Sequence, residues 1–226
     1  MSTILKSAIK FPIGVLIFVG LPLVGWGVTD IRGFLGHQAR LAYVVLTVLL
    51  QAGVVMLAPG VGRQGGGGKE TVRRQRIAVI LLQVLSLSIV IAAPWGDRRE
   101  VGALGDEAWV RYPGLVLLAM GFLVMNWAEA SLGKLFSIQV EVQEGHRLVT
   151  EGPYRLLRHP RYAGILLFNT GLALVFRSWL GLILVVALAG VLLWRVHDEE
   201  ALMRREFGAD WEAYSARSWR FIPFIY

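Results

Sequence analysis

Six long apolar stretches constrain the fold of this chain more than any other feature. The first three are each 19 residues long and carry no charged residue. About 20 apolar residues span the ~30 Å hydrocarbon core of a bilayer, and the 55% hydrophobic content exceeds that of soluble domains. The sequence therefore predicts an all-α integral membrane protein. The stretches are Phe11–Thr29, Leu41–Pro59, Ile77–Trp95, Tyr112–Ala128, Tyr162–Phe176 and Ser178–Trp194.

The last two stretches are shorter, at 15 and 17 residues, and only Arg177 separates them. They predict a tight helical hairpin that is tilted or does not fully span, so five to six transmembrane helices are expected. Residues 195–226 then alternate charged with aromatic side chains, which is typical of an amphipathic tail on the membrane surface. Two regions follow: residues 1–130 with four spans, and residues 131–226 with a polar loop, the hairpin and the tail.

The basic residues are distributed unevenly between the two ends of these stretches. If the N-terminus is cytoplasmic, 17 of the 23 lysines and arginines fall on the cytoplasmic side. The positive-inside rule then predicts cytoplasmic termini and a cytoplasmic segment 146–162. The net charge of +7 reflects this topology and anionic lipids rather than a nucleic-acid partner. No metal site is expected, because the chain lacks cysteine and no His/Asp/Glu cluster has metal-ligand spacing.

The polar segment HRLVTEGPYRLLRHPRY, residues 146–162, lies between apolar runs and predicts the functional site. Polar and charged groups are costly near lipid, so their presence there indicates binding or catalysis. Pro160 biases His159 away from helical geometry, and the helix that follows offers unpaired N–H groups to an anion. His159 and Tyr162 are candidate binding residues at its mouth, whereas Arg155 is expected to extend to lipid headgroups.

Arg195 and Glu199 are four residues apart, so they share one face of a helix that continues from the last apolar stretch. One interpretation is a mutual salt bridge that ends the span. The other is an arginine offered to an anionic substrate and a glutamate offered to a cationic cofactor. The spacing leaves both open. Glu129, at the end of the fourth stretch, is expected to have a structural role beside a basic neighbour.

Five sequence pieces carry a family resemblance: LGKLFS, Ile138-Gln139, HRLVTEGPYRLLRHPRYAG, DEEAL and FGADWEAYSARSWRFIP. In this order and spacing, over residues 132–223, the chain resembles the isoprenylcysteine carboxyl methyltransferase family and the related membrane phospholipid methyltransferases. The resemblance implies S-adenosylmethionine as cofactor, in a cytoplasmic pocket between the last spans and the tail. It also implies a lipid-like or prenylated methyl acceptor that enters from the bilayer.

The resemblance further implies roles for individual residues. Arg195 stands where the family has an arginine that faces the substrate carboxylate. The implied cofactor contacts are Gln139, His146, Arg147, Leu148, Val149, Tyr154, His159, Pro160, Arg161, Tyr162 and Glu199.

The function expected from these features is methyl transfer to a lipophilic acceptor at the cytoplasmic face. A carboxylate acceptor is favoured, because it is already ionised and needs no base; an amine or thiol would require one, and His159 or Glu200 would be the candidates. One alternative is an NADPH-dependent membrane reductase of the sterol-reductase type. Those reductases tend to carry asparagine where this chain has Arg161, which favours the methyltransferase. A non-enzymatic transport or assembly protein would have polar residues inside several spans, whereas the polar residues in these six stretches are scattered and none is ionised.

Overall fold

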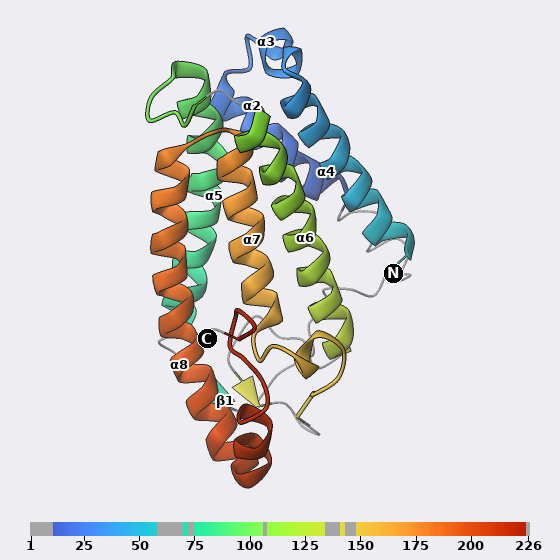
Figure 1. Ribbon diagram of the computed structural model, residues 1–226, viewed down its shortest axis with the longest axis vertical. Coiled ribbons are helices and arrows are strands. Elements are labelled where there is room, and N and C mark those ends of the chain that lie inside the picture. The colour runs from blue at the N-terminus through green and yellow to red at the C-terminus, as the bar shows by residue number, and fades with distance from the viewer. Residues whose placement is uncertain are drawn as a thin grey trace.

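The described part of the chain is almost entirely helical. The computed structural model describes residues 11–57, 70–71, 75–105, 108–133, 141–142 and 148–224. Within these ranges, one two-residue strand, β1 (Glu70–Thr71), pairs antiparallel with another, β2 (Glu141–Val142). The long helices run side by side in an elongated bundle (Figure 1). The predicted all-α class is confirmed.

The bundle begins with an apolar helix, Phe11–Trp26, which contains the π-helical turn η1 (Leu16–Gly20) and α2 (Leu21–Trp26). The remaining helices are α3 (Ile31–Gly36), α4 (Gln38–Leu57), α5 (Gln75–Arg99), α6 (Ala108–Leu132), the 3-10 turn η3 (Gly152–Arg155), α7 (Pro160–Val175) and α8 (Trp179–Ser215).

Each predicted apolar stretch overlaps one of these helices. Four of them, α4, α5, α6 and α8, are long and apolar enough to cross a membrane. The other two, α7 and the first helix, have 16 residues each and are about 24 Å long at 1.5 Å per residue, shorter than a ~30 Å hydrocarbon core. The predicted hairpin is confirmed: α7 and α8 are joined by a tight turn at Arg177, whose φ is 38°.

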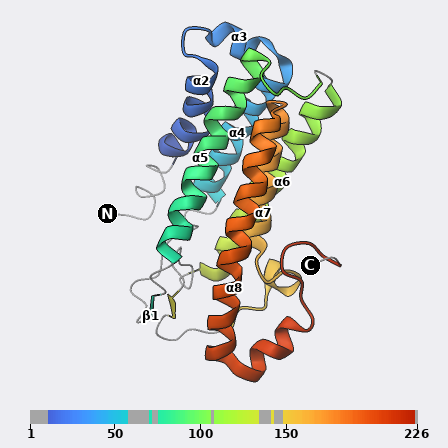
Figure 2. The ribbon, with the colours of Figure 1, turned by 90° about the vertical axis from the view of Figure 1, so that its left-hand side faces the viewer.

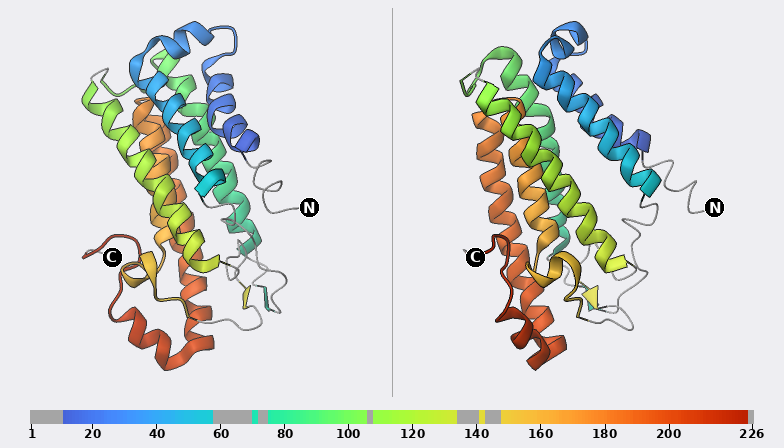
Figure 3. Two further views of the ribbon diagram at one scale, coloured as in Figure 1. Left: turned by 90° about the vertical axis from the view of Figure 1, so that its right-hand side faces the viewer. Right: turned by 45° about the vertical axis from the view of Figure 1, so that its right-hand side comes forward.

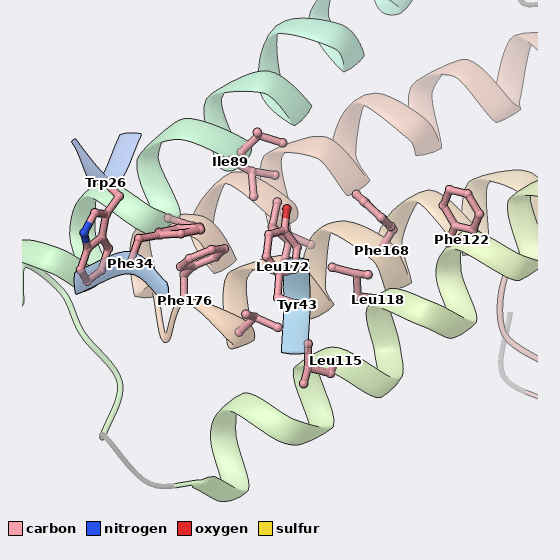
Figure 4. Packing of buried hydrophobic residues seen from close by; sticks show 14 residues of the cluster. Trp26, Phe34, Tyr43, Ile89, Leu115, Leu118, Phe122, Phe168, Leu172 and Phe176 are labelled. Carbon is pink, nitrogen blue, oxygen red and sulfur yellow. The ribbon is translucent and has the colours of Figure 1, made fainter. Parts of the chain in front are cut away.

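Helix α7 occupies the middle of the bundle between α6 and α8, with α5 packed against α8 (Figures 1 and 2). The buried side chains around its second half form the main core (Figure 4). Phe176, just after α7, stacks on Phe34 with ring centroids 6.0 Å apart and meets Tyr43 edge-on at 5.3 Å. These contacts anchor α3 and α4 to the end of α7.

Two pairs of glycines bring α6 and α7 into backbone contact. Gly121 of α6 faces Gly164 of α7, and Gly114 of α6 faces Gly171 of α7. The two glycines of each helix are seven residues apart. A methyl group at Gly121 would lie 2.3 Å from the backbone nitrogen of Phe168, closer than any packed carbon can approach. The close contact fixes the position of α7 and, with it, the residues at its first turn.

Helix α8 continues well past the last apolar stretch, for 37 residues in all. Gly208, with φ 48° and ψ −117°, breaks the helical path, and the chain then turns back along the bundle (Figures 2 and 3). The tail therefore begins as a continuation of α8 over residues 195–207 rather than as a separate surface helix. Residues 216–224 return to the loop before α7, where Leu157 and Trp219 form a parallel bridge.

A buried charge cluster joins the helices at the end where α7 meets α8. The carboxylate of Asp97 accepts hydrogen bonds from Arg111 Nη1 and Nη2, both at 2.9 Å. Arg177 Nε at 2.6 Å and Arg40 Nη1 at 3.2 Å complete the cluster. Both Asp97 and Arg111 are almost inaccessible to solvent. One carboxylate thus holds together α4, α5, α6 and the hairpin turn.

Candidate active site

Of the residues predicted to form the site, those in α7 and α8 gather where α7 begins, beside the lower half of α8 and below the apolar part of the bundle (Figure 1). Helix α7 contributes Tyr162 and its N-cap His159, and α8 contributes Arg195, Glu199 and Glu200. This end lies opposite the Asp97 cluster, since the two are at the two ends of α7.

His159 is held outside the helix, as its position before proline predicts. Its φ of −126° and ψ of 58° are non-helical, and Pro160 occupies the first position of α7, where a missing N–H has no consequence. The buried imidazole stacks on the ring of Tyr162, with centroids 5.6 Å apart and planes 4° from parallel. The proline and the stacking together fix which way the imidazole points.

Arg195, Tyr162 and Glu199 form a hydrogen-bonded triad. Arg195 Nε donates to the Tyr162 hydroxyl at 2.7 Å and to Glu199 Oε1 at 2.9 Å. The Tyr162 hydroxyl in turn donates to Glu199 Oε1 at 2.5 Å. The salt bridge that the spacing predicts is therefore formed, and Arg195 is only 3% exposed. Because a guanidinium has five N–H donors, these bonds at Nε do not prevent it from binding a second carboxylate.

The imidazole of His159 lies between two consecutive glutamates. Its Nδ1 is 3.6 Å from Glu199 Oε2, and its Nε2 is 3.3 Å from Glu200 Oε1. The contact with Glu200 is a hydrogen bond when Nε2 carries a proton, because a carboxylate can only accept. His159 thus connects the Arg195–Tyr162–Glu199 triad to Glu200.

Glu200 is enclosed by cationic side chains. Arg158 Nε donates to its Oε1 at 3.0 Å, and Arg220 donates to its Oε2 at 3.0 Å from Nε and 2.8 Å from Nη2. From the sequence, Glu200 was expected only as a possible base, and Arg220 was not predicted to contact it. The adjacent glutamates mark this place in the sequence, but no local spacing relates Glu200 to partners 42 and 20 residues away.

A second ion pair borders the site where α6 ends. Arg161 Nε lies 2.9 Å from Glu129 Oε1, so the predicted pairing of Glu129 with a basic neighbour is confirmed. Tyr154 lies within electrostatic range of both residues and of Glu199, and burial raises the pKa of its phenol. Tyr154 therefore offers a neutral hydroxyl at neutral pH. Its backbone carbonyl accepts a hydrogen bond from Tyr214 at 2.8 Å, which attaches the η3 turn to α8.

The other predicted site residues either make no side-chain contact described above or lie outside the described part of the chain. Leu148 and Val149 are half-buried in a segment without regular structure, and Arg155 is exposed, as expected for a side chain that reaches lipid headgroups. The predicted contacts Gln139, His146 and Arg147 lie outside the described residues. In the described ranges, no group of three or more His, Asp or Glu side chains is arranged to hold a metal ion.

Comparisons with known proteins identify the relatives of this chain. A family profile described as phospholipid methyltransferase matches residues 109–210, which include α7, most of α8 and the whole Arg195–Tyr162–Glu199 triad. A probable protein-S-isoprenylcysteine O-methyltransferase of Oryza sativa subsp. indica is 27% identical over 165 residues, covering 70% of this chain and 84% of that protein. The chain is similar in sequence to isoprenylcysteine O-methyltransferases.

Further relatives carry the same name. Protein-S-isoprenylcysteine O-methyltransferase A of Arabidopsis thaliana is 31% identical over 129 residues, covering 54% of this chain and 64% of that protein. The Mus musculus enzyme is 27% identical over 134 residues, or 58% of this chain and 45% of that protein. The resemblance stated from the sequence is confirmed: these relatives are named methyltransferases, and four helices of this chain are long and apolar enough to cross a membrane.

Proposed function

We propose that this methyltransferase uses S-adenosylmethionine to methylate the carboxylate of a lipophilic acceptor, such as a prenylated cysteine, at the cytoplasmic face of a membrane. The observation that carries the proposal is the triad of Arg195, Tyr162 and Glu199. It joins a buried guanidinium, a phenol and a carboxylate at the mouth of α7. The names of the relatives supply the acceptor class.

The residues of the triad fit the proposed cofactor. When bound, S-adenosylmethionine supplies an electrophilic methyl group on a sulfonium. The cofactor also carries an ammonium and a carboxylate, so its pocket needs groups of both signs. Glu199 suits the cationic part, and the stacked rings of His159 and Tyr162 offer a flat surface with hydrogen-bonding edges. Tyr154 adds a neutral phenol close to Glu199.

Arg195 is the residue proposed to orient the acceptor. A planar guanidinium binds a carboxylate with defined geometry, and Tyr162 and Glu199 hold Arg195 in place from one side. Displacement reactions gain about 7–11 kcal/mol of barrier lowering from such alignment. A carboxylate acceptor also agrees with the surroundings of Glu200. Both oxygens of Glu200 accept bonds from cations, which disfavours proton uptake there.

The proposed cytoplasmic location of the site follows from the distribution of basic residues. The described end with the site carries Arg155, Arg158, Arg161, Arg195, Arg204, Arg205, Arg217 and Arg220. Polar loops rich in arginine remain on the cytoplasmic side during membrane insertion. The apolar helices beside the site would let a prenyl chain remain in the bilayer while its carboxylate reaches Arg195.

The test is calorimetric titration of the detergent-purified protein with S-adenosylhomocysteine and, separately, with NADPH. We expect saturable binding of S-adenosylhomocysteine that weakens at least tenfold in Glu199→Gln. Glu212→Gln is the matched control, because Glu212 lies on the same helix with its side chain 56% exposed, and its affinity should stay within twofold of wild type. Arg195→Gln should retain binding within threefold but lose methyl transfer. Binding of NADPH without S-adenosylhomocysteine would overturn the proposal in favour of a reductase.

A further inference from the structure

The two consecutive glutamates of α8 point into different surroundings. Glu199 contacts Tyr162 and Arg195 within the triad. Glu200 is turned towards the C-terminal segment instead, is 5% exposed, and accepts from Arg220 at 2.8 Å. Adjacent carboxylates with such different partners do not need to share a function.

The segment bound by Glu200, residues 216–224, is here termed the C-terminal strap. It lies along the loop before α7 through three backbone hydrogen bonds. Trp219 N donates to Leu156 O at 3.0 Å, Arg158 N to Trp219 O at 2.6 Å, and His159 N to Arg220 O at 3.1 Å. The loop that holds His159 is therefore also the loop to which the strap is bound.

Side chains extend this attachment. Arg158 Nη1 donates to the backbone carbonyls of Ser215, at 2.8 Å, and Ser218. The ring of Phe221 lies 6.0 Å from that of His159 and packs in a buried cluster with Tyr162. The strap thus forms a wall directly against the two stacked rings.

We propose that Glu200 is a positioning residue that keeps the C-terminal strap closed over the cofactor site. It does so through Arg220 and Arg158, and it fixes the imidazole of His159 by its bond to Nε2. The inference rests on the proposed function in one respect: His159 and Tyr162 must border the cofactor. Glu200 itself need not touch cofactor or acceptor.

The contacts distinguish this role from that of a general base. A base needs a lone pair directed at the reacting proton, whereas the oxygens of Glu200 are bound to Arg158, His159 and Arg220. A charge-assisted bond to a buried carboxylate contributes enough free energy to change an equilibrium by tenfold or more. Loss of the Arg220 bond is therefore expected to shift the strap towards an open state.

The kinetic test uses Arg220→Gln, with Arg217→Gln as matched control. Arg217 is an exposed arginine three residues earlier in the same strap. A partly open strap lowers the fraction of protein that is competent to bind, so the apparent affinity falls in proportion. We expect Arg220→Gln to raise KM for S-adenosylmethionine at least tenfold, with kcat at saturating cofactor and KM for the acceptor within threefold. Arg220→Lys should recover part of the loss, and Arg217→Gln should match wild type.

A merely structural role for Glu200 and Arg220 gives a different result. Global destabilisation would lower kcat through loss of active protein and leave KM for S-adenosylmethionine unchanged. That outcome, or an Arg220→Gln variant indistinguishable from Arg217→Gln, would overturn the proposal. Glu200→Gln should raise the same KM, and combining it with Arg220→Gln should add less than the product of the two single effects, because the two residues act through one contact.

A second measurement tests the strap without cofactor or catalysis. The chain contains no cysteine, so Ser218→Cys introduces a single thiol at a position that is 8% exposed. Maleimide labelling of this thiol should be at least tenfold faster in the Arg220→Gln background than in the Arg217→Gln background. Equal labelling rates would overturn the strap proposal even if S-adenosylhomocysteine binds. Faster labelling in a protein that binds no S-adenosylhomocysteine would support the strap and contradict the proposed function.

Discussion

Asp97→Asn is expected to be among the most destabilising isosteric substitutions in this protein. The substitution keeps the size of the side chain but removes a negative charge that three buried arginines share. Arg40, Arg111 and Arg177 all lie within 3.2 Å of the carboxylate. The asparagine would also direct an NH2 group at a guanidinium, so at least one bond is replaced by a repulsive contact.

The magnitude follows from the burial of the cluster. Removing one partner of a buried ion pair leaves an uncompensated charge and costs about 3–5 kcal/mol. Arg111 would lose the most stabilisation, because it is 1% exposed and donates twice to Asp97. For a domain of this length, 1 kcal/mol shifts the melting temperature by about 2–4 °C. Asp97→Asn should therefore melt about 6–20 °C below wild type.

Thermal unfolding of the purified protein in detergent provides the assay. The control is Glu100→Gln, which removes a carboxylate from the same end of the bundle. Glu100 is 81% exposed and 4.0 Å from Arg177, and such surface pairs contribute at most about 1 kcal/mol. If Asp97→Asn melts within 2 °C of Glu100→Gln, the cluster does not hold the helices together. Below the melting transition, S-adenosylhomocysteine affinity should be unchanged, since the site lies at the other end of α7.

Three further predictions concern the bundle and the border of the site. Gly121→Ala should lower stability by about 1–3 kcal/mol, because its methyl group would overlap the backbone of α7, whereas Gly190→Ala, with open space around its Cβ, should melt at or above the wild-type temperature. Tyr162→Phe should reduce kcat/KM by about 5- to 150-fold through loss of the hydroxyl that joins Arg195 to Glu199; an unchanged value would mean that this hydroxyl has no role in catalysis. Glu129→Gln should shift the free energy of unfolding by less than about 1 kcal/mol, since the Arg161–Glu129 pair is partly exposed, and a larger loss in chemical denaturation would contradict that estimate.

The parts of the site that sequence reasoning predicted are those that depend on short spacings. A proline fixes the residue directly before it, so the non-helical backbone of His159 was predictable. Residues four apart on a helix share a face, and Arg195 and Glu199 do bond. The six apolar stretches likewise predicted where six of the helices lie in the sequence. Their hydrophobic lengths did not predict how far α8 extends beyond the last stretch.

The parts that were not predicted depend on contacts between distant residues. Asp97 lies 57 residues from Arg40 and 80 from Arg177, and no local spacing relates these residues to one another. Only packing of the helices brings them together. The glycine pairs did leave a signal, the repeated seven-residue spacing of Gly114 with Gly121 and of Gly164 with Gly171. That spacing indicates close helix contact without specifying the partner helix.

The central claim is that this chain methylates a lipophilic carboxylate by means of S-adenosylmethionine. The most direct measurement is transfer of a tritiated methyl group from S-adenosylmethionine to N-acetyl-S-farnesylcysteine by the purified protein in phospholipid nanodiscs. We predict labelled product that releases its methyl group in base, as a methyl ester does, and that is absent with Arg195→Gln. Base-stable label on phospholipid, or no transfer by folded protein, would contradict the account.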